Sequence, residues 1–150
     1  MNQQTLQTPQ TALSTEAGTL ADKFSGLARV MAGKYGWKPV EGVRSVGDVF
    51  NLIVDENGIL AGTLTGVGGG RGAPITDPEE MQAALKTSYA NLQKTISGLS
   101  DSEVKAPVKL FGKDFTKDSA IRYLFGDQHE HLGQSIAYAR SNGVVPPWSK

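Results

Sequence analysis

The sequence predicts an all-α protein built as an antiparallel four-helix bundle. Apolar residues recur at helical spacing in four segments, and turn or capping residues separate these segments. No long run of alternating polar and apolar residues predicts a sheet, and no internal repeat is present. A chain of 150 residues can close such a bundle around one core. We therefore expect one domain over residues 14–150, preceded by a flexible polar arm over residues 1–13.

The composition excludes several classes of function. The chain carries 15 Lys and Arg and 15 Asp and Glu, so its formal net charge is zero, and no basic run suggests a nucleic-acid partner. It has no cysteine, which excludes disulfides, thiolate zinc sites and a cysteine nucleophile. No signal peptide or membrane-spanning run is apparent. We expect a cytoplasmic protein without a membrane partner, and the zero net charge favours self-association.

The first two helices are predicted from their caps. Ser14 or Thr15 can begin the first helix, which Gly33 ends. Ser45 and Asp48 form a capping box at the start of the second helix. The buried faces of the two helices should contain Leu20, Phe24, Leu27, Ala28 and Met31, and then Val46, Val49, Phe50, Ile53, Leu60 and Leu64.

Glycine is frequent at the end of the second helix and beyond it. Gly58 and Gly62 indicate either a close packing contact or an early end of the helix. The run of residues 66–72 is interpreted as a connecting loop, because no Lys-Ser/Thr pair follows it and no strand precedes it, as a phosphate-binding loop would require.

The third and fourth helices have equally clear boundaries. Asp77 and Pro78 begin the third helix, with acidic residues in its first turn. A short hairpin is predicted near Val108 to Phe115. Thr116 caps the fourth helix, which Gly143 ends.

A polar stripe marks the fourth helix as the candidate functional element. Helical spacing places Asp127, His131, Gln134 and Tyr138 on one face, beside an apolar stripe. A polar stripe close to a core requires partners. A carboxylate and an imidazole four residues apart can hold a divalent metal ion, or they can hydrogen-bond to each other or to a facing helix. His129 lies ~200° around the helix from His131 and is expected to be exposed.

Two stretches of the chain resemble the DinB-like (DinB/YfiT) metalloenzyme family. The residues that carry the resemblance are Trp37-Lys38-Pro39 with Gly42 to Asn51, and His129 to Arg140 with Asn142 to Trp148. The resemblance implies a four-helix bundle, commonly a homodimer, in which three histidines hold a divalent ion such as nickel or zinc. One histidine comes from the second helix and two, four residues apart, come from the last. Some relatives are thiol-dependent transferases or isomerases.

The sequence departs from this histidine pattern at two of three positions. His131 keeps one ligand, Asp127 replaces another with a possible oxygen ligand, and Leu52 occupies the third position. Glu56, Asn51 or Gln134 could supply a replacement ligand. A site so altered should bind nickel or zinc weakly or not at all, since an aliphatic side chain cannot coordinate. The alternative is a site without a metal ion, in which Asp127 hydrogen-bonds to His131 and Leu52 packs where a metal would lie.

Two classes of function remain open, and the sequence does not decide whether the protein is an enzyme. The first is a DinB-like protein with a degenerate divalent-metal site, related to thiol-dependent transferases. The second is a non-catalytic protein, binding a small-molecule ligand or a partner, that kept the bundle and lost the metal. Leu52 and Asp127 are the residues that separate the two hypotheses.

Overall fold

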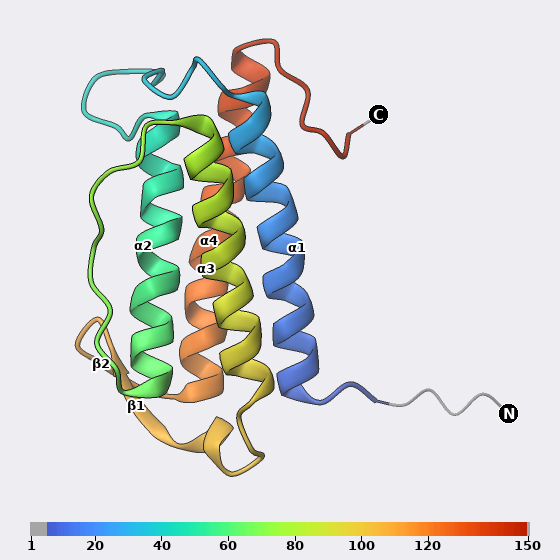
Figure 1. Cartoon of the computed structure of the whole chain (residues 1–150), viewed down its shortest axis with the longest axis vertical. Coiled ribbons are helices and arrows are strands. Elements are labelled where there is room, and N and C mark those ends of the chain that lie inside the picture. The colour runs from blue at the N-terminus through green and yellow to red at the C-terminus, as the bar shows by residue number, and fades with distance from the viewer. Residues whose placement is uncertain (1–5, 150) are drawn as a thin grey trace, which may run out of the picture.

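The computed structural model describes residues 6–149 and confirms the all-α four-helix bundle (Figure 1). Its helices are α1 (Pro9–Val30), α2 (Val46–Thr65), α3 (Pro78–Ser97) and α4 (Lys117–Ser141). Between α3 and α4 lie a short 3-10 helix (Glu103–Lys105) and the antiparallel strands β1 (Pro107–Leu110) and β2 (Lys113–Thr116). This hairpin matches the one predicted near residues 108–115.

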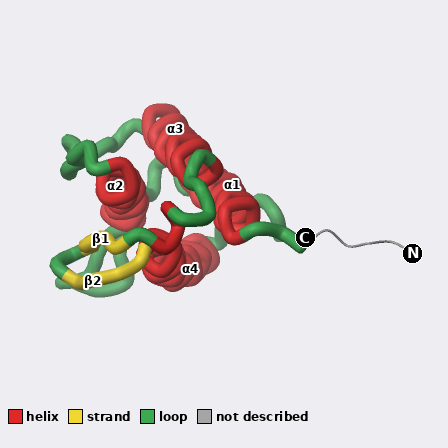
Figure 2. The backbone as a smooth tube through the Cα atoms, turned by 90° about the horizontal axis from the view of Figure 1, so that it is seen from below, coloured by secondary structure: helices red, strands yellow, loops and turns green. Residues whose placement is uncertain are grey.

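The helices do not simply alternate in direction. The chain runs along α1 and α4 in one direction and along α2 and α3 in the other, so α2 and α3 are parallel (Figure 1). The predicted antiparallel arrangement is therefore wrong for this pair, although it holds for α1 with α2 and for α3 with α4. The physical reason is the connection 66–77, which is long enough to return along the whole of α2 before α3 begins. Figure 2 shows α1 beside α3, and the hairpin beside α2 and α4.

Specific contacts hold this returning connection against α2. The Asn51 amide donates to the carbonyl of Ile75 at 3.0 Å and accepts from its N–H at 2.8 Å. A Cβ on Gly62 would lie 2.7 Å from the amide nitrogen of Gly69, and one on Gly69 would collide with the carbonyl oxygen of Gly58. The glycines of α2 thus allow close packing, and the packed segment is the connection rather than another helix.

The first helix begins earlier than predicted. Thr8 caps it, Pro9 occupies its first turn, and Gln10 and Leu13 are buried. The flexible arm predicted over residues 1–13 therefore cannot extend past Thr8, and residues 1–5 lie outside the described part of the chain. Buried Gln10 donates to the carbonyl of Leu99 at 3.2 Å, which ties the start of α1 to the segment after α3.

The other predicted helix boundaries are confirmed. Ser45 and Asp48 form the capping box of α2, Asp77 caps α3 ahead of Pro78, and Thr116 caps α4. These local signals are reliable because each satisfies backbone N–H groups that no helical turn can satisfy. Gly143 adopts a φ of 69° directly after the end of α4, as a helix-terminating glycine should.

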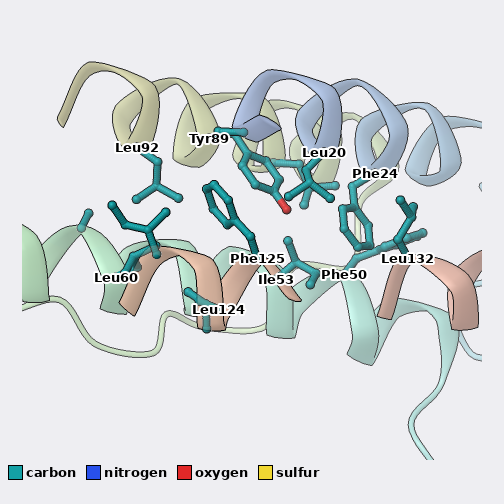
Figure 3. Packing of buried hydrophobic residues seen from close by; sticks show 14 of the residues in the cluster. Leu20, Phe24, Phe50, Ile53, Leu60, Tyr89, Leu92, Leu124, Phe125 and Leu132 are labelled. Carbon is teal, nitrogen blue, oxygen red and sulfur yellow. The ribbon is translucent and has the colours of Figure 1, made fainter. Parts of the chain in front are cut away.

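All four helices contribute to one hydrophobic core. Figure 3 shows Phe24 of α1, Phe50 of α2, Tyr89 of α3 and Phe125 of α4 meeting between the helices, and all four are fully buried. Within residues 6–149, no helix combines the length and hydropathy needed to cross a bilayer.

Candidate functional site

The polar stripe of α4 forms a continuous hydrogen-bonded chain. His131 Nδ1 lies 3.0 Å from Gln134 Oε1, and Gln134 Nε2 donates to the Tyr138 hydroxyl at 3.0 Å. The hydroxyl donates to the backbone carbonyl of Arg44 at 2.9 Å. The partner required by the predicted stripe is therefore the loop before α2, and this chain anchors that loop to α4.

The direction of this chain fixes the tautomer of His131. The Arg44 carbonyl can only accept, so the Tyr138 hydroxyl donates to it and accepts from the Gln134 NH₂ group. The carbonyl oxygen of Gln134 then faces His131, so Nδ1 must carry the hydrogen. This leaves Nε2 as the nitrogen that is available for a ligand or a second proton.

That free nitrogen faces a carboxylate. His131 Nε2 lies 3.4 Å from Asp127 Oδ2, and the side chain of His131 is 16% exposed while that of Asp127 is 40% exposed. Two lone-pair-bearing atoms at this separation repel each other unless a proton or a cation is shared between them. The pair can therefore hold a proton, as an imidazolium beside a carboxylate, or contribute two ligands to a metal ion.

Glu56 of α2 adds a second carboxyl group to this region. Its side chain is buried, and its Oε1 has no hydrogen-bond partner. Burial and the neighbouring carboxyl group of Asp127 raise the pKa of Glu56 to about 8, against a smaller lowering by the positive charge of Arg44. Glu56 therefore keeps its proton at neutral pH, and a protonated carboxyl group is a poor metal ligand.

Two hydrogen bonds set the level of α2 relative to α4. Gln128 of α4 donates to Asn57 of α2 at 2.8 Å, and Tyr138 bonds to Arg44 just before α2. Because α2 and α4 run in opposite directions, positions between these two links pair in reverse order. The helical turn from residue 56 back to residue 52 on α2 thus runs alongside the turn from residue 127 forward to residue 131 on α4. Position 52 of α2 therefore lies at about the level of position 131 of α4.

The described residues do not assemble a complete set of metal ligands. Within residues 6–149, no group of three His, Cys, Asp or Glu side chains is placed to hold one ion. Of the predicted substitutes, the Asn51 amide is used by Ile75 and Gln134 is used by His131 and Tyr138. The structure brings together Asp127 and His131, with Glu56 near Asp127.

A buried polar network behind the site was missed by sequence analysis. The Tyr89 hydroxyl donates to Gln128 Oε1 at 2.7 Å, and Gln128 Nε2 donates to Asn57 Oδ1 at 2.8 Å. Asn57 in turn donates to the Ser88 hydroxyl at 3.0 Å. The signal was available, because Asn57 and Gln128 each follow a core residue, Ile53 or Leu124, by four positions. This network links α2, α3 and α4 beside Glu56 and Asp127.

His129 lies apart from the site, as its position on the helix predicts. Its Nε2 is 2.9 Å from Glu16 Oε1 of α1, and its side chain is 47% exposed. It therefore ties α4 to α1 at the surface and serves as an internal comparison for His131.

Comparison with known proteins establishes the fold and nothing finer. No family model and no curated protein matches the sequence. The crystal structure of a DinB-like protein, YjoA of Bacillus subtilis, superposes with a TM-score of 0.75 at 14% sequence identity. The alignment covers 89% of this chain and 93% of that chain. The two proteins therefore share the whole bundle.

Proposed function

We propose that this chain is a DinB-like protein that retains a reduced divalent-cation site at Asp127 and His131. The observation that carries the proposal is the hydrogen-bond chain from the Arg44 carbonyl, which keeps His131 Nε2 unprotonated in the neutral form and directs it at Asp127. Metal-binding histidines are commonly oriented in this way, through a hydrogen bond made by the other ring nitrogen.

The donor set fits weak binding of a borderline metal such as zinc or nickel. One imidazole nitrogen and one carboxylate oxygen are suitable ligands, but Leu52 contributes none and Glu56 holds its proton at neutral pH. An ion held there would act as a Lewis acid. Because the chain has no cysteine, the thiol of a thiol-dependent transfer would come from a low-molecular-weight cosubstrate. Thiol transfer is accordingly the reaction class to assay first.

Calorimetric titration of the untagged protein with ZnCl₂ tests this proposal. We expect a single site with a dissociation constant above about 1 μM, because two ligands replace the usual three or four. His131→Ala should abolish binding, whereas His129→Ala removes a surface histidine and should leave it unchanged. Equal loss in both variants, or no saturable binding to the native chain, would overturn the proposal.

Restoring the histidine pattern gives a stronger test. Leu52→His together with Asp127→His should raise zinc affinity by at least about 100-fold, since two imidazoles would join His131 at positions that the helix register pairs. Equilibrium dialysis measures the change. No gain in the double variant would show that residue 52 does not face His131.

The second candidate is a non-catalytic ligand-binding protein with the same fold. The incomplete ligand set within residues 6–149 favours it. Purified native protein that holds no zinc or nickel under saturating conditions, yet binds a small molecule, would favour this class. In either case we propose a homodimer, which light scattering coupled to gel filtration would detect as twice the mass of 15.9 kDa.

A further inference from the structure

The surface beside the candidate site is hollowed. A pocket of about 620 Å³ is lined by Gly42, Val43, Arg44, Asp48 and Gln134. Gln134 is also the residue that orients His131, so one side chain links the pocket to the imidazole. Gln134 is its lining residue from α4, and Asp48 comes from the first turn of α2. The other lining residues belong to the loop that the Tyr138 hydroxyl holds in place through the Arg44 carbonyl.

The charge in this pocket is available to a ligand. Among the described residues 6–149, the Arg44 side chain is exposed and forms no ion pair. Asp48, which also lines the pocket, accepts from the backbone N–H of Ser45 at 3.0 Å as part of the helix cap. The two side chains therefore do not neutralise each other through a direct contact, although the charge of Arg44 acts on Asp48 from a distance.

The pocket also offers an apolar surface. Val43 is 40% exposed and lines the pocket beside Arg44. A guanidinium beside an exposed aliphatic side chain is suited to a planar carboxylate attached to an apolar body, because guanidinium and carboxylate pair through two parallel hydrogen bonds. A bare inorganic anion would leave Val43 unused.

We propose that this pocket binds a small organic carboxylate, with Arg44 receiving the carboxylate group and Val43 covering its apolar part. The ligand would then extend over Gln134 toward His131. The proposal that the pocket binds a carboxylate depends only on the residues that line it. Any role of His131 toward the bound ligand rests on the proposed function.

A matched pair of probes tests the carboxylate requirement. Benzoate and benzamide share shape and ring, but only benzoate is charged. Titration of isotopically labelled protein with each probe would be followed through the Arg44 backbone amide and the Gln134 side-chain NH₂ signals. We expect saturable binding of benzoate in the millimolar range and at least about tenfold weaker binding of benzamide. Equal binding of the two probes would overturn the proposal.

Three variants test the assignment to Arg44. Arg44→Gln should weaken benzoate binding about tenfold, and Arg44→Lys should restore part of it because the charge remains. Arg140→Gln removes another exposed arginine, beyond the pocket on α4, and should bind benzoate as the native protein does. Since the loop is anchored by the backbone carbonyl of Arg44, Arg44→Gln leaves that anchor intact. Unchanged binding in Arg44→Gln would overturn the assignment.

Zinc titration of the same variants separates this inference from the proposed function. Arg44→Gln should show the weakened benzoate binding but keep the zinc affinity of the native protein. If the native chain binds benzoate but no zinc, the pocket is supported and the metal site fails. If the native chain binds zinc but not benzoate, the pocket proposal fails and the metal site is supported.

Discussion

Glu56 is an acidic residue buried inside the bundle. Its carboxyl group is buried, carries one oxygen without a partner and lies near the carboxyl group of Asp127. Such a group is costly to ionise, because burial and the neighbouring carboxyl group outweigh the favourable charge of Arg44. Its neutral form is accordingly the one that the fold stabilises.

This gives a pH dependence of stability with a definite sign. The pKa of Glu56 rises from 4.5 to about 8 on folding, so between these values the unfolded chain releases a proton that the folded chain keeps. The stabilisation from Glu56 is fully present below pH 4.5 and is lost as pH rises through about 8. Glu56→Gln should remove this loss and be more stable than the native protein at pH 9, by on the order of 2 kcal/mol after allowance for screening at partly exposed Asp127.

Urea unfolding at pH 5 and pH 9 checks the effect, with Glu130→Gln as the control because Glu130 is an exposed glutamate, on α4. A native protein and a Glu56→Gln variant that lose stability in parallel between these pH values would contradict this assignment.

Sequence analysis at the residue scale succeeded where the interactions were local. The spacing of Asp127, His131, Gln134 and Tyr138 predicts one polar face, and hydrogen bonds or close contacts join consecutive members of that set. It could not identify Arg44 as the end of the chain, because a backbone carbonyl 94 residues away leaves no trace in composition or periodicity.

At the scale of elements, the connection 66–77 determines the topology. Its return along α2 makes α2 and α3 parallel, and Asn51 is the side chain that bonds to its backbone. The sequence analysis treated this run only as a loop. Glycine content predicts that a segment can approach a helix closely, but it does not predict which helix or in which direction.

Replacement of Asn51 should therefore loosen this connection. Asn51→Ala removes both hydrogen bonds to Ile75 and leaves that backbone group partly buried, which should cost about 1–3 kcal/mol of unfolding free energy. Amide hydrogen exchange at Ile75 should accelerate as well. Asn91→Ala, at an exposed position of α3, controls for the higher helix propensity of alanine. Retained protection at Ile75 in Asn51→Ala would show that the remaining contacts hold the connection, namely the glycine contacts and the bond from the Gly72 N–H to Asp55.

The start of α1 carries a local helix signal that its polar surroundings obscure. Thr8 followed by Pro9 is a helix start, but the polar residues around it indicated an arm. Helix formation there depends on Gln10 and Leu13 finding partners in the rest of the bundle. Such tertiary stabilisation overrides local polarity, and a single sequence does not reveal it.

At the scale of the whole molecule, the core is shared by all four helices. Its apolar members are largely predictable from periodicity. Periodicity also places Asn57 and Gln128 on buried faces, but it does not reveal that they bond to each other and to Tyr89. Fully satisfied polar groups of this kind align helices along their axes, because any sliding would leave buried donors and acceptors unpaired.

Substitution of Phe50 tests how tightly this core is packed. Its ring is completely buried and meets that of Tyr35 edge-on at 5.5 Å between centroids. Phe50→Ala should cost about 3–5 kcal/mol of unfolding free energy, through lost burial and the cavity left behind. Phe111→Ala is the matched control, since Phe111 is 55% exposed at the hairpin turn, and it should cost less than about 1 kcal/mol. Similar losses in the two variants would place Phe50 outside the rigid part of the core.

The bond between the Tyr138 hydroxyl and the Arg44 carbonyl has a consequence for proton placement. If a ligand pulled the Arg44 carbonyl away, the Tyr138 hydroxyl would be free to donate to Gln134 instead, and the amide could rotate. His131 would then face an NH₂ group, and its hydrogen would move from Nδ1 to Nε2. Occupancy of the outer loop would in this way be transmitted to the imidazole as a change of tautomer, with no movement of the helix that carries it.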